Sequence, residues 1–142
     1  MKAIIKKLTA VFPSPVSFNF SLLFFRVAVS IELMVAHGLK KLGVGVLQAE
    51  QIPNPLHLPE MLNNGFAVAA NLVFPLFIII GLLTRLAILP VLAVTLTGYF
   101  ILHWNDSLLE KDTPFMYSVS YLLLIILGPG KYSLDYWINK KY

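Results

Sequence analysis

The 142-residue sequence contains no cysteine and few charged residues. Without a thiol, the chain can form no disulfide of its own and offers neither a thiolate metal ligand nor a thiol relay. Only 13% of its residues are charged, compared with roughly 25% in an average soluble domain. So few charges cannot coat a globule in water, and an ordinary soluble domain is therefore excluded.

Several motifs that carry chemistry are also missing from the sequence. It has no glycine-rich phosphate loop, nucleophile elbow or paired-histidine zinc motif, so nothing supports a nucleotide-binding or hydrolase function. A metal site normally needs three or four ligands, and His57 is the only imidazole besides those of His37 and His103. We therefore expect neither a metal nor a nucleotide.

The sequence does contain long apolar runs, because 58% of its residues are hydrophobic. A helix needs about 20 such residues to cross a hydrocarbon core of about 30 Å. The runs predict an all-α integral membrane four-helix bundle that forms a single domain over residues 1–142, with spans at about 17–42, 62–83, 86–104 and 113–127. The fourth span is short for a full crossing. Only Leu83-Thr84-Arg85 separates the second and third spans, which predicts an antiparallel hairpin.

Shorter segments at both ends of the chain are predicted to lie in the membrane interface. Ile4, Leu8 and Val11 recur at helical spacing between lysines, which favours an interfacial helix over residues 2–12. Residues 131–142 form an aromatic and basic tail of the kind found at the inner interface. Before the fourth span, Asp112 or Thr113 is predicted to cap a helix whose first residue is Pro114.

The distribution of Lys and Arg predicts that both termini are cytoplasmic. One side of the predicted topology carries Lys2, Lys6, Lys7, Arg85, Lys131, Lys140 and Lys141, and the other carries Lys40, Lys41 and Lys111. The net charge of +4 lies mostly at the two ends of the chain, where it suits an anionic membrane surface rather than a nucleic acid.

The first span holds three ionisable residues at membrane depth, Arg26, Glu32 and His37. Arg26 and His37 share a helix face within about 20°, whereas Glu32 is turned roughly 120° away. Arg26 and Glu32 therefore cannot form a simple pair within the helix, and each needs a partner on another one. Asn71 is a candidate partner for Arg26, and Tyr99 or His103 for Glu32.

A polar stripe on the third span supplies the second half of a candidate site. Thr95, Tyr99 and His103 recur at i, i+4 and i+8 and are predicted to face the bundle interior. His37 and His103 both fall at the outer ends of their helices. We therefore take Glu32, His37, Tyr99 and His103 as candidate ligand-binding residues.

A purely structural interpretation competes with this one. Arg26, Glu32 and Asn71 would then form a network that holds the bundle together, the histidines would only anchor the interface, and Lys40 and Lys41 would snorkel to the headgroups.

Three short motifs resemble the DoxX family of small bacterial membrane proteins. They are Arg26 with His37-Gly38-Leu39-Lys40-Lys41, then Gly81-Leu82-Leu83-Thr84-Arg85, and finally Gly128-Pro129-Gly130-Lys131-Tyr132-Ser133-Leu134-Asp135. The resemblance implies a four-helix membrane protein related to the DoxD subunit of thiosulfate:quinone oxidoreductase. It also implies that Arg26, His37, Lys40, Thr84 and Arg85 match the recurring motif.

Together these observations predict a multi-pass protein of the bacterial inner (plasma) membrane, associated with a quinone and forming part of a membrane redox complex. Quinone reduction takes up protons, which requires imidazole or carboxyl groups beside an apolar slot. The expected partners are membrane lipids and a redox partner subunit, and a homo-oligomer is left open. The alternative is a non-enzymatic membrane scaffold or small-solute carrier. Whether the chain catalyses a reaction by itself is likewise left open.

Overall fold

The computed structural model describes residues 14–141, in which the regular secondary structure is helical and no strand occurs. The predicted interfacial helix over residues 2–12 lies outside this described part. The first long helix runs without interruption from Pro15 to Lys41 and consists of α2 (Pro15–Leu33), the π-helical turn η1 (Met34–Gly38) and α3 (Leu39–Lys41). Ser14 caps its start through a bond from the Ser17 N–H to its side chain. The predicted first span is confirmed as a helix of membrane length.

The second long helix, Glu60–Ile80, consists of α4 (Glu60–Val68), the π-helical turn η2 (Ala69–Val73) and α5 (Phe74–Ile80). It ends three residues before the predicted boundary at residue 83. Gly81 stops it by adopting a left-handed conformation with φ of 73°, which glycine adopts at little steric cost.

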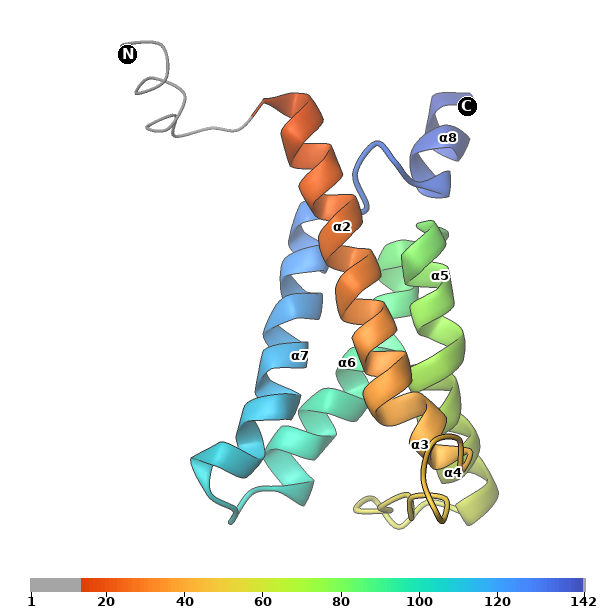
Figure 1. Cartoon of the computed structure of the whole chain (residues 1–142), viewed down its shortest axis with the longest axis vertical. Coiled ribbons are helices and arrows are strands. Elements are labelled where there is room, and N and C mark those ends of the chain that lie inside the picture. The colour runs from red at the N-terminus through yellow and green to blue at the C-terminus, as the bar shows by residue number, and fades with distance from the viewer. Residues whose placement is uncertain (1–13, 142) are drawn as a thin grey trace.

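The third long helix, Thr84–Leu102, consists of α6 (Thr84–Thr97) and the π-helical turn η3 (Gly98–Leu102). It follows the second helix after a turn of only three residues, so the two form the predicted hairpin (Figure 1). These three helices are long and apolar enough to cross a membrane.

A fourth helix, α7, spans Leu108–Leu127 and packs chiefly against α6. Its predicted start at residue 113 is wrong by five residues. Ser107 and Glu110 form a reciprocal capping box, which satisfies backbone donors one turn earlier, and Pro114 is accommodated inside the helix. Because Glu110, Lys111 and Asp112 lie near its beginning, α7 is not apolar over its whole length.

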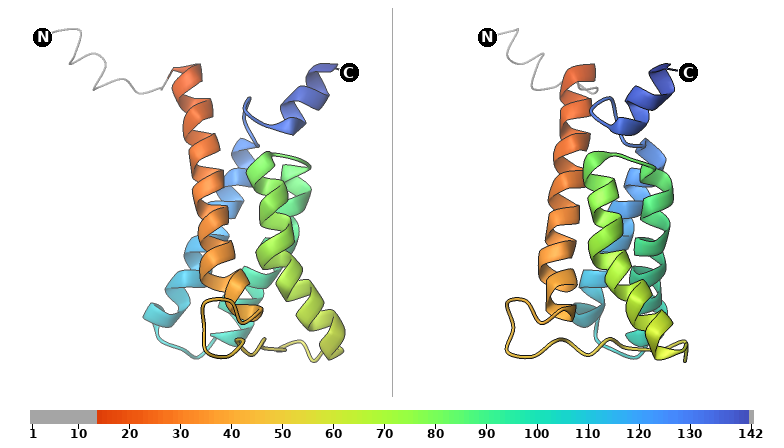
Figure 2. Two further views of the ribbon diagram at one scale, coloured as in Figure 1. Left: turned by 45° about the vertical axis from the view of Figure 1, so that its right-hand side comes forward. Right: turned by 90° about the vertical axis from the view of Figure 1, so that its right-hand side faces the viewer.

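The four long helices alternate in direction, and the start of α2 lies at the same end of the bundle as the last helix, α8 (Leu134–Lys141) (Figures 1 and 2). The opposite end carries the irregular connection over residues 42–59. We call these the motif end and the loop end, because the motif residues Gly81–Arg85 and Gly128–Asp135 lie at the first of them.

The interior of the bundle is narrow, and many large apolar side chains lie on its outside. The core consists of Leu22, Leu33, Ile78, Ala87, Ile88, Val91, Leu92, Tyr121 and Leu124. Phe20, Phe24 and Ile126 are among the exposed ones. Small polar residues also join the helices, since Ser118 Oγ lies 2.9 Å from Thr95 Oγ1, as is common between helices in lipid.

Candidate functional site

At the motif end, the guanidinium of Arg26 holds the segment that follows α7. Arg26 is only 1% exposed, and its Nη1 donates a 2.6 Å hydrogen bond to the carbonyl of Pro129. Its other terminal nitrogen donates to the carbonyl of Tyr132. Gly81 makes room for this contact, because a Cβ there would lie 2.7 Å from Arg26 Nη1. The predicted partnership with Asn71 is wrong, since Arg26 reaches backbone carbonyls at the other end of the bundle.

Asp135 completes this end by capping α6. One of its carboxylate oxygens accepts from the Leu83 N–H at 2.7 Å. The other accepts from the Thr84 N–H at 2.9 Å and from Thr84 Oγ1 at 2.8 Å. A carboxylate is favoured here because the first N–H groups of a helix are unpaired and carry partial positive charge.

Arg85 and Asn19 add two further links between distant segments. Arg85 Nε donates a 3.1 Å bond to the carbonyl of Ile125, near the end of α7. Asn19 on α2 accepts from the Lys131 N–H at 2.7 Å. The motif residues Arg26, Thr84 and Arg85 thus tie the helix ends together, and their contacts are structural.

The loop end contains the larger cavity, with a volume of about 600 Å³. Side chains from all four long helices and from the 42–59 connection line it. Its polar lining residues are His37, Lys41, Glu50, Asn63, Asn71, Thr95, Thr97, His103, Glu110, Thr113 and Tyr117, and most of the remainder are apolar. His37 and His103, which lie far apart in the sequence, therefore meet on one cavity.

Three π-helical turns surround this cavity, one in each of the first three long helices. η1 contains His37, η2 contains Asn71, and η3 begins and ends with the lining residues Gly98 and Leu102. Single π-helical turns are rare and often occur at functional sites. η1 and η2 also approach each other closely, because a Cβ on Gly38 would lie 2.6 Å from the carbonyl oxygen of Asn71.

The imidazoles have defined neighbours. The ring of Tyr117 packs edge-on against that of His37, with 5.5 Å between the centroids. His103 Nδ1 lies 2.7 Å from the carboxylate of Asp106, which orients its ring and selects the tautomer.

Asn71 is the least satisfied polar residue on the cavity wall. It is 3% exposed, and its Oδ1 has no hydrogen-bond partner within residues 14–141. At the loop side of the cavity, Lys41 Nζ lies 3.9 Å from Glu50. A buried amide oxygen without a partner is costly, so Asn71 Oδ1 is available to accept a hydrogen bond from a donor group of a bound molecule.

Two predicted site residues lie away from the cavity. Glu32 is exposed on α2 and does not line it, and the predicted bonds from Tyr99 or His103 to Glu32 are not formed. Instead, Tyr99 packs against Phe100 and Phe115, at 4.9 and 5.7 Å between ring centroids. Lys40 is also exposed and lies outside the lining.

The sequence interpretation missed Tyr117, Lys41, Glu50 and Glu110 as lining residues. Tyr117 carried a usable signal, because Pro114, Tyr117, Ser118 and Tyr121 recur at helical spacing along α7. Such a stripe faces other helices rather than lipid. Glu50 lies in an irregular connection, where periodicity gives no guide.

Comparison with known proteins decides the family. The DoxX family model matches residues 21–104, which is more than half of the chain. The chain belongs to the DoxX family. The family resemblance is thereby confirmed, with the first two of the three motifs inside the matched residues, and the chain is a helical membrane protein.

Two curated relatives of this DoxX chain are similar over part of their lengths. An uncharacterized protein of Haemophilus influenzae is 33% identical over 98 residues, which cover 66% of this chain and 65% of that protein. Inner membrane protein YqjF of Escherichia coli is 38% identical over 71 residues, which cover 47% of this chain and 55% of that protein. The chain thus spans less than two thirds of either relative. No solved structure matches.

The DoxX match includes Arg26, His37, Asn71 and Arg85 but ends before α7. The groups of α7 and of the following segment that contact these residues therefore lie outside the matched residues. Among them are the carbonyls that Arg26 contacts and the ring of Tyr117 beside His37.

Proposed function

We propose that this DoxX chain binds a quinone in the loop-end cavity and serves as a subunit of a membrane redox complex. The supporting observation is the cavity itself, which combines an apolar wall with the imidazoles of His37 and His103 and the unpaired amide oxygen of Asn71. Ligand sites in proteins are mostly apolar clefts of about 300 to 1,000 Å³ with a few polar groups that fix orientation. A quinone ring has a matching division, with apolar faces and two carbonyl oxygens at opposite edges.

The polar groups have separate tasks in this proposal. His37 and His103 approach from different helices and would bond the two carbonyl oxygens, while Asn71 Oδ1 would accept a hydrogen bond from a hydroxyl of the reduced ring. Reduction of a quinone takes up two electrons, which the redox partner subunit would supply, and adds protons at those oxygens, which an imidazole can supply near neutral pH. Asp106 would fix the orientation of the His103 ring, whose Nδ1 it contacts. Tyr117 would hold the ring of His37 in place.

The membrane topology belongs to the same proposal. All four long helices would cross a bacterial inner membrane, with both termini cytoplasmic. The last crossing would use the apolar part of α7, and its charged first turn would lie in the outer interface. This orientation places Arg85, Lys131, Lys140 and Lys141 inside, as expected from the preference of basic loops for the cytoplasm. The cavity would then open near the outer leaflet.

Quinone extraction provides the test. The protein is purified gently from its native membrane, extracted with organic solvent, and assayed for quinone by mass spectrometry. We expect stoichiometric quinone in the parent and a loss of at least tenfold in a His37→Asn/His103→Asn double variant, because two hydrogen bonds worth ~1 kcal/mol each are removed.

His57 supplies a matched control. It is exposed, does not line the cavity, and has a φ of 52°, a conformation that asparagine tolerates well. His57→Asn should retain the quinone. Equal quinone in the parent and the double variant would contradict the assignment of the site. Absence of quinone from the parent protein would favour the scaffold or small-solute carrier function instead.

A further inference from the structure

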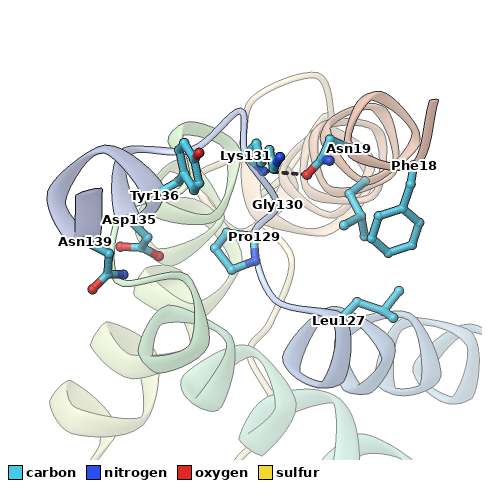
Figure 3. A pocket seen from close by; sticks show the side chains of 10 residues that line it. Phe18, Asn19, Leu127, Pro129, Gly130, Lys131, Asp135, Tyr136 and Asn139 are labelled. Carbon is cyan, nitrogen blue, oxygen red and sulfur yellow. Dashed lines mark hydrogen bonds between the residues drawn. The ribbon is translucent and has the colours of Figure 1, made fainter. Parts of the chain in front are cut away.

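A second pocket, at the motif end, is separate from the candidate quinone site. Its volume is about 330 Å³, and it lies among the first turns of α2, the end of α7 and helix α8. Figure 3 shows Phe18 and Leu127 on one side of the Pro129-Gly130 segment and Tyr136 and Asn139 on the other. The pocket therefore has an apolar side that belongs to two long helices and a polar side that belongs to α8.

The pocket and the buried Arg26 behind it together carry one net positive charge, since Lys131 and Asp135 are the charged lining residues. Asp135 lines it, but its carboxylate already accepts three hydrogen bonds at the start of α6. Lys131 is exposed, and its side chain has no ion-pair partner within residues 14–141. The buried cation of Arg26 lies behind the same segment and bonds the carbonyls of Pro129 and Tyr132. One cation is thus buried behind the pocket and a second lies free at its edge.

Helix α8 places the pocket in the interfacial region of a membrane. Its exposed residues include Trp137, which is 74% exposed, together with Ile138 and Lys140. Aromatic and basic side chains of this kind concentrate at the headgroup level. Phe18 and Leu127 lie on the helix surfaces that continue towards the hydrocarbon. A molecule bound there would have its polar part at the headgroup level and its apolar part towards the hydrocarbon, which is the arrangement of a phospholipid.

We propose that this pocket binds the phosphate-bearing headgroup of an anionic phospholipid. Lys131 pairs with the phosphate, Asn139 and Tyr136 offer polar contacts to the headgroup, and Phe18, Leu22 and Leu127 contact the beginning of the acyl chains. Basic pockets between membrane helices recognise anionic headgroups in this way. The lipid thereby fixes the motif end of the bundle to one leaflet.

Lipid retention by the full chain in detergent tests this assignment. Native mass spectrometry compares binding of phosphatidylglycerol with that of phosphatidylcholine of the same acyl composition. We expect the parent to retain phosphatidylglycerol preferentially. Lys131→Ala should weaken that binding about fivefold, which is what one basic residue contributes beside an anionic lipid surface, and Lys131→Arg should restore it. The substitution preserves the backbone bond from Lys131 to Asn19, so the variant should fold.

Lys140→Ala is the matched control, because Lys140 is an exposed lysine of α8 that does not line the pocket. If Lys131→Ala and Lys140→Ala weakened lipid binding equally, general surface charge would explain the effect and the assignment of the lipid to this pocket would be overturned. Equal retention of the two lipids by the parent would also overturn it. Displacement of the lipid by millimolar inorganic phosphate would assign the pocket to free phosphate instead. Quinone content is read separately, so either proposal can fail without the other.

Discussion

Arg26 shows how a single charged residue can be accommodated inside an apolar bundle. Its partners are two carbonyl oxygens rather than a carboxylate, and Asp135 is the nearby acidic group. A guanidinium has five donors in a fixed plane and is suited to bonding several carbonyls at once. The residue therefore fastens the segment after α7, and its buried Nε has no hydrogen-bond partner within residues 14–141.

Removal of this guanidinium should strongly destabilise the protein. Arg26→Met leaves the carbonyls of Pro129 and Tyr132 without their donors, at a cost of about 3 kcal/mol for two charge-assisted bonds. The measurement is unfolding in detergent followed by heat or denaturant.

Arg85→Met is the comparison for Arg26→Met, because the exposed Arg85 makes one bond, to the carbonyl of Ile125. Its loss should cost about 1 kcal/mol. Wild-type stability of Arg26→Met would contradict the structural role of Arg26.

Tyr99 is a candidate site residue that does not line the cavity, and the reason is the local geometry of its helix. The sequence stripe of Thr95, Tyr99 and His103 assumed a constant turn of 100° per residue. The π-helical turn η3 begins at Gly98 and acts as a local insertion that shifts the helical phase. Thr95 lies before the shift and lines the cavity, whereas Tyr99 lies within it and turns to Phe115. No hydrophobic pattern marks such a shift, so periodicity alone could not reveal it.

At the scale of elements, glycine and proline gave good guidance to most boundaries. Gly81 and Gly128 end the second and fourth helices with positive φ angles of 73° and 76°, and the short turn before Thr84 correctly predicted the hairpin. The sequence prediction places the start of α7 too late, because Pro114 suits a first turn well. The Ser107-x-x-Glu110 box gives an earlier start. Two valid start signals compete here, and the reciprocal hydrogen bonds favour the earlier one.

A pair of substitutions distinguishes these two starts. Ser107→Ala removes the capping box and should lower the free energy of unfolding by about 1 kcal/mol. Thr113→Ala should have little effect, because Thr113 is exposed within the helix. Thermal unfolding in detergent gives the comparison. A larger loss from Thr113→Ala would place the helix start at the residue predicted from the sequence.

At the scale of the whole molecule, the two ends of the bundle are built differently. The motif end is closed by hydrogen bonds that join α2 and α6 to the segment after α7 and by a bond from α6 to the end of α7. The loop end is hollow and surrounded by three π-helical turns. The equal depth of His37 and His103 could be predicted by counting along helices. The cavity that joins them could not, since its shape depends on how helices pack and on an irregular connection.

The absence of cysteine allows the proposed topology to be mapped directly, because any introduced thiol is the only one in the chain. With both termini inside, His57→Cys in the 42–59 connection should react with a membrane-impermeant maleimide in intact cells, whereas Lys140→Cys should react only after the membrane is opened. The reverse labelling pattern would invert the orientation. Reaction of both in intact cells would place the two ends of the bundle on the same side.

The bonds from Arg26 to Pro129 and Tyr132 join residues 103 and 106 positions apart, and this has a consequence for biosynthesis. When the first helix leaves the ribosome, the carbonyls that satisfy its cation have not yet been made. The first helix must therefore wait at the insertion machinery, or keep its guanidinium at the headgroups, until the final hydrophobic segment has emerged. Assembly of the bundle is thus completed only when the segment after α7 is in place. A chain interrupted after the third helix leaves the Arg26 guanidinium without these carbonyl partners.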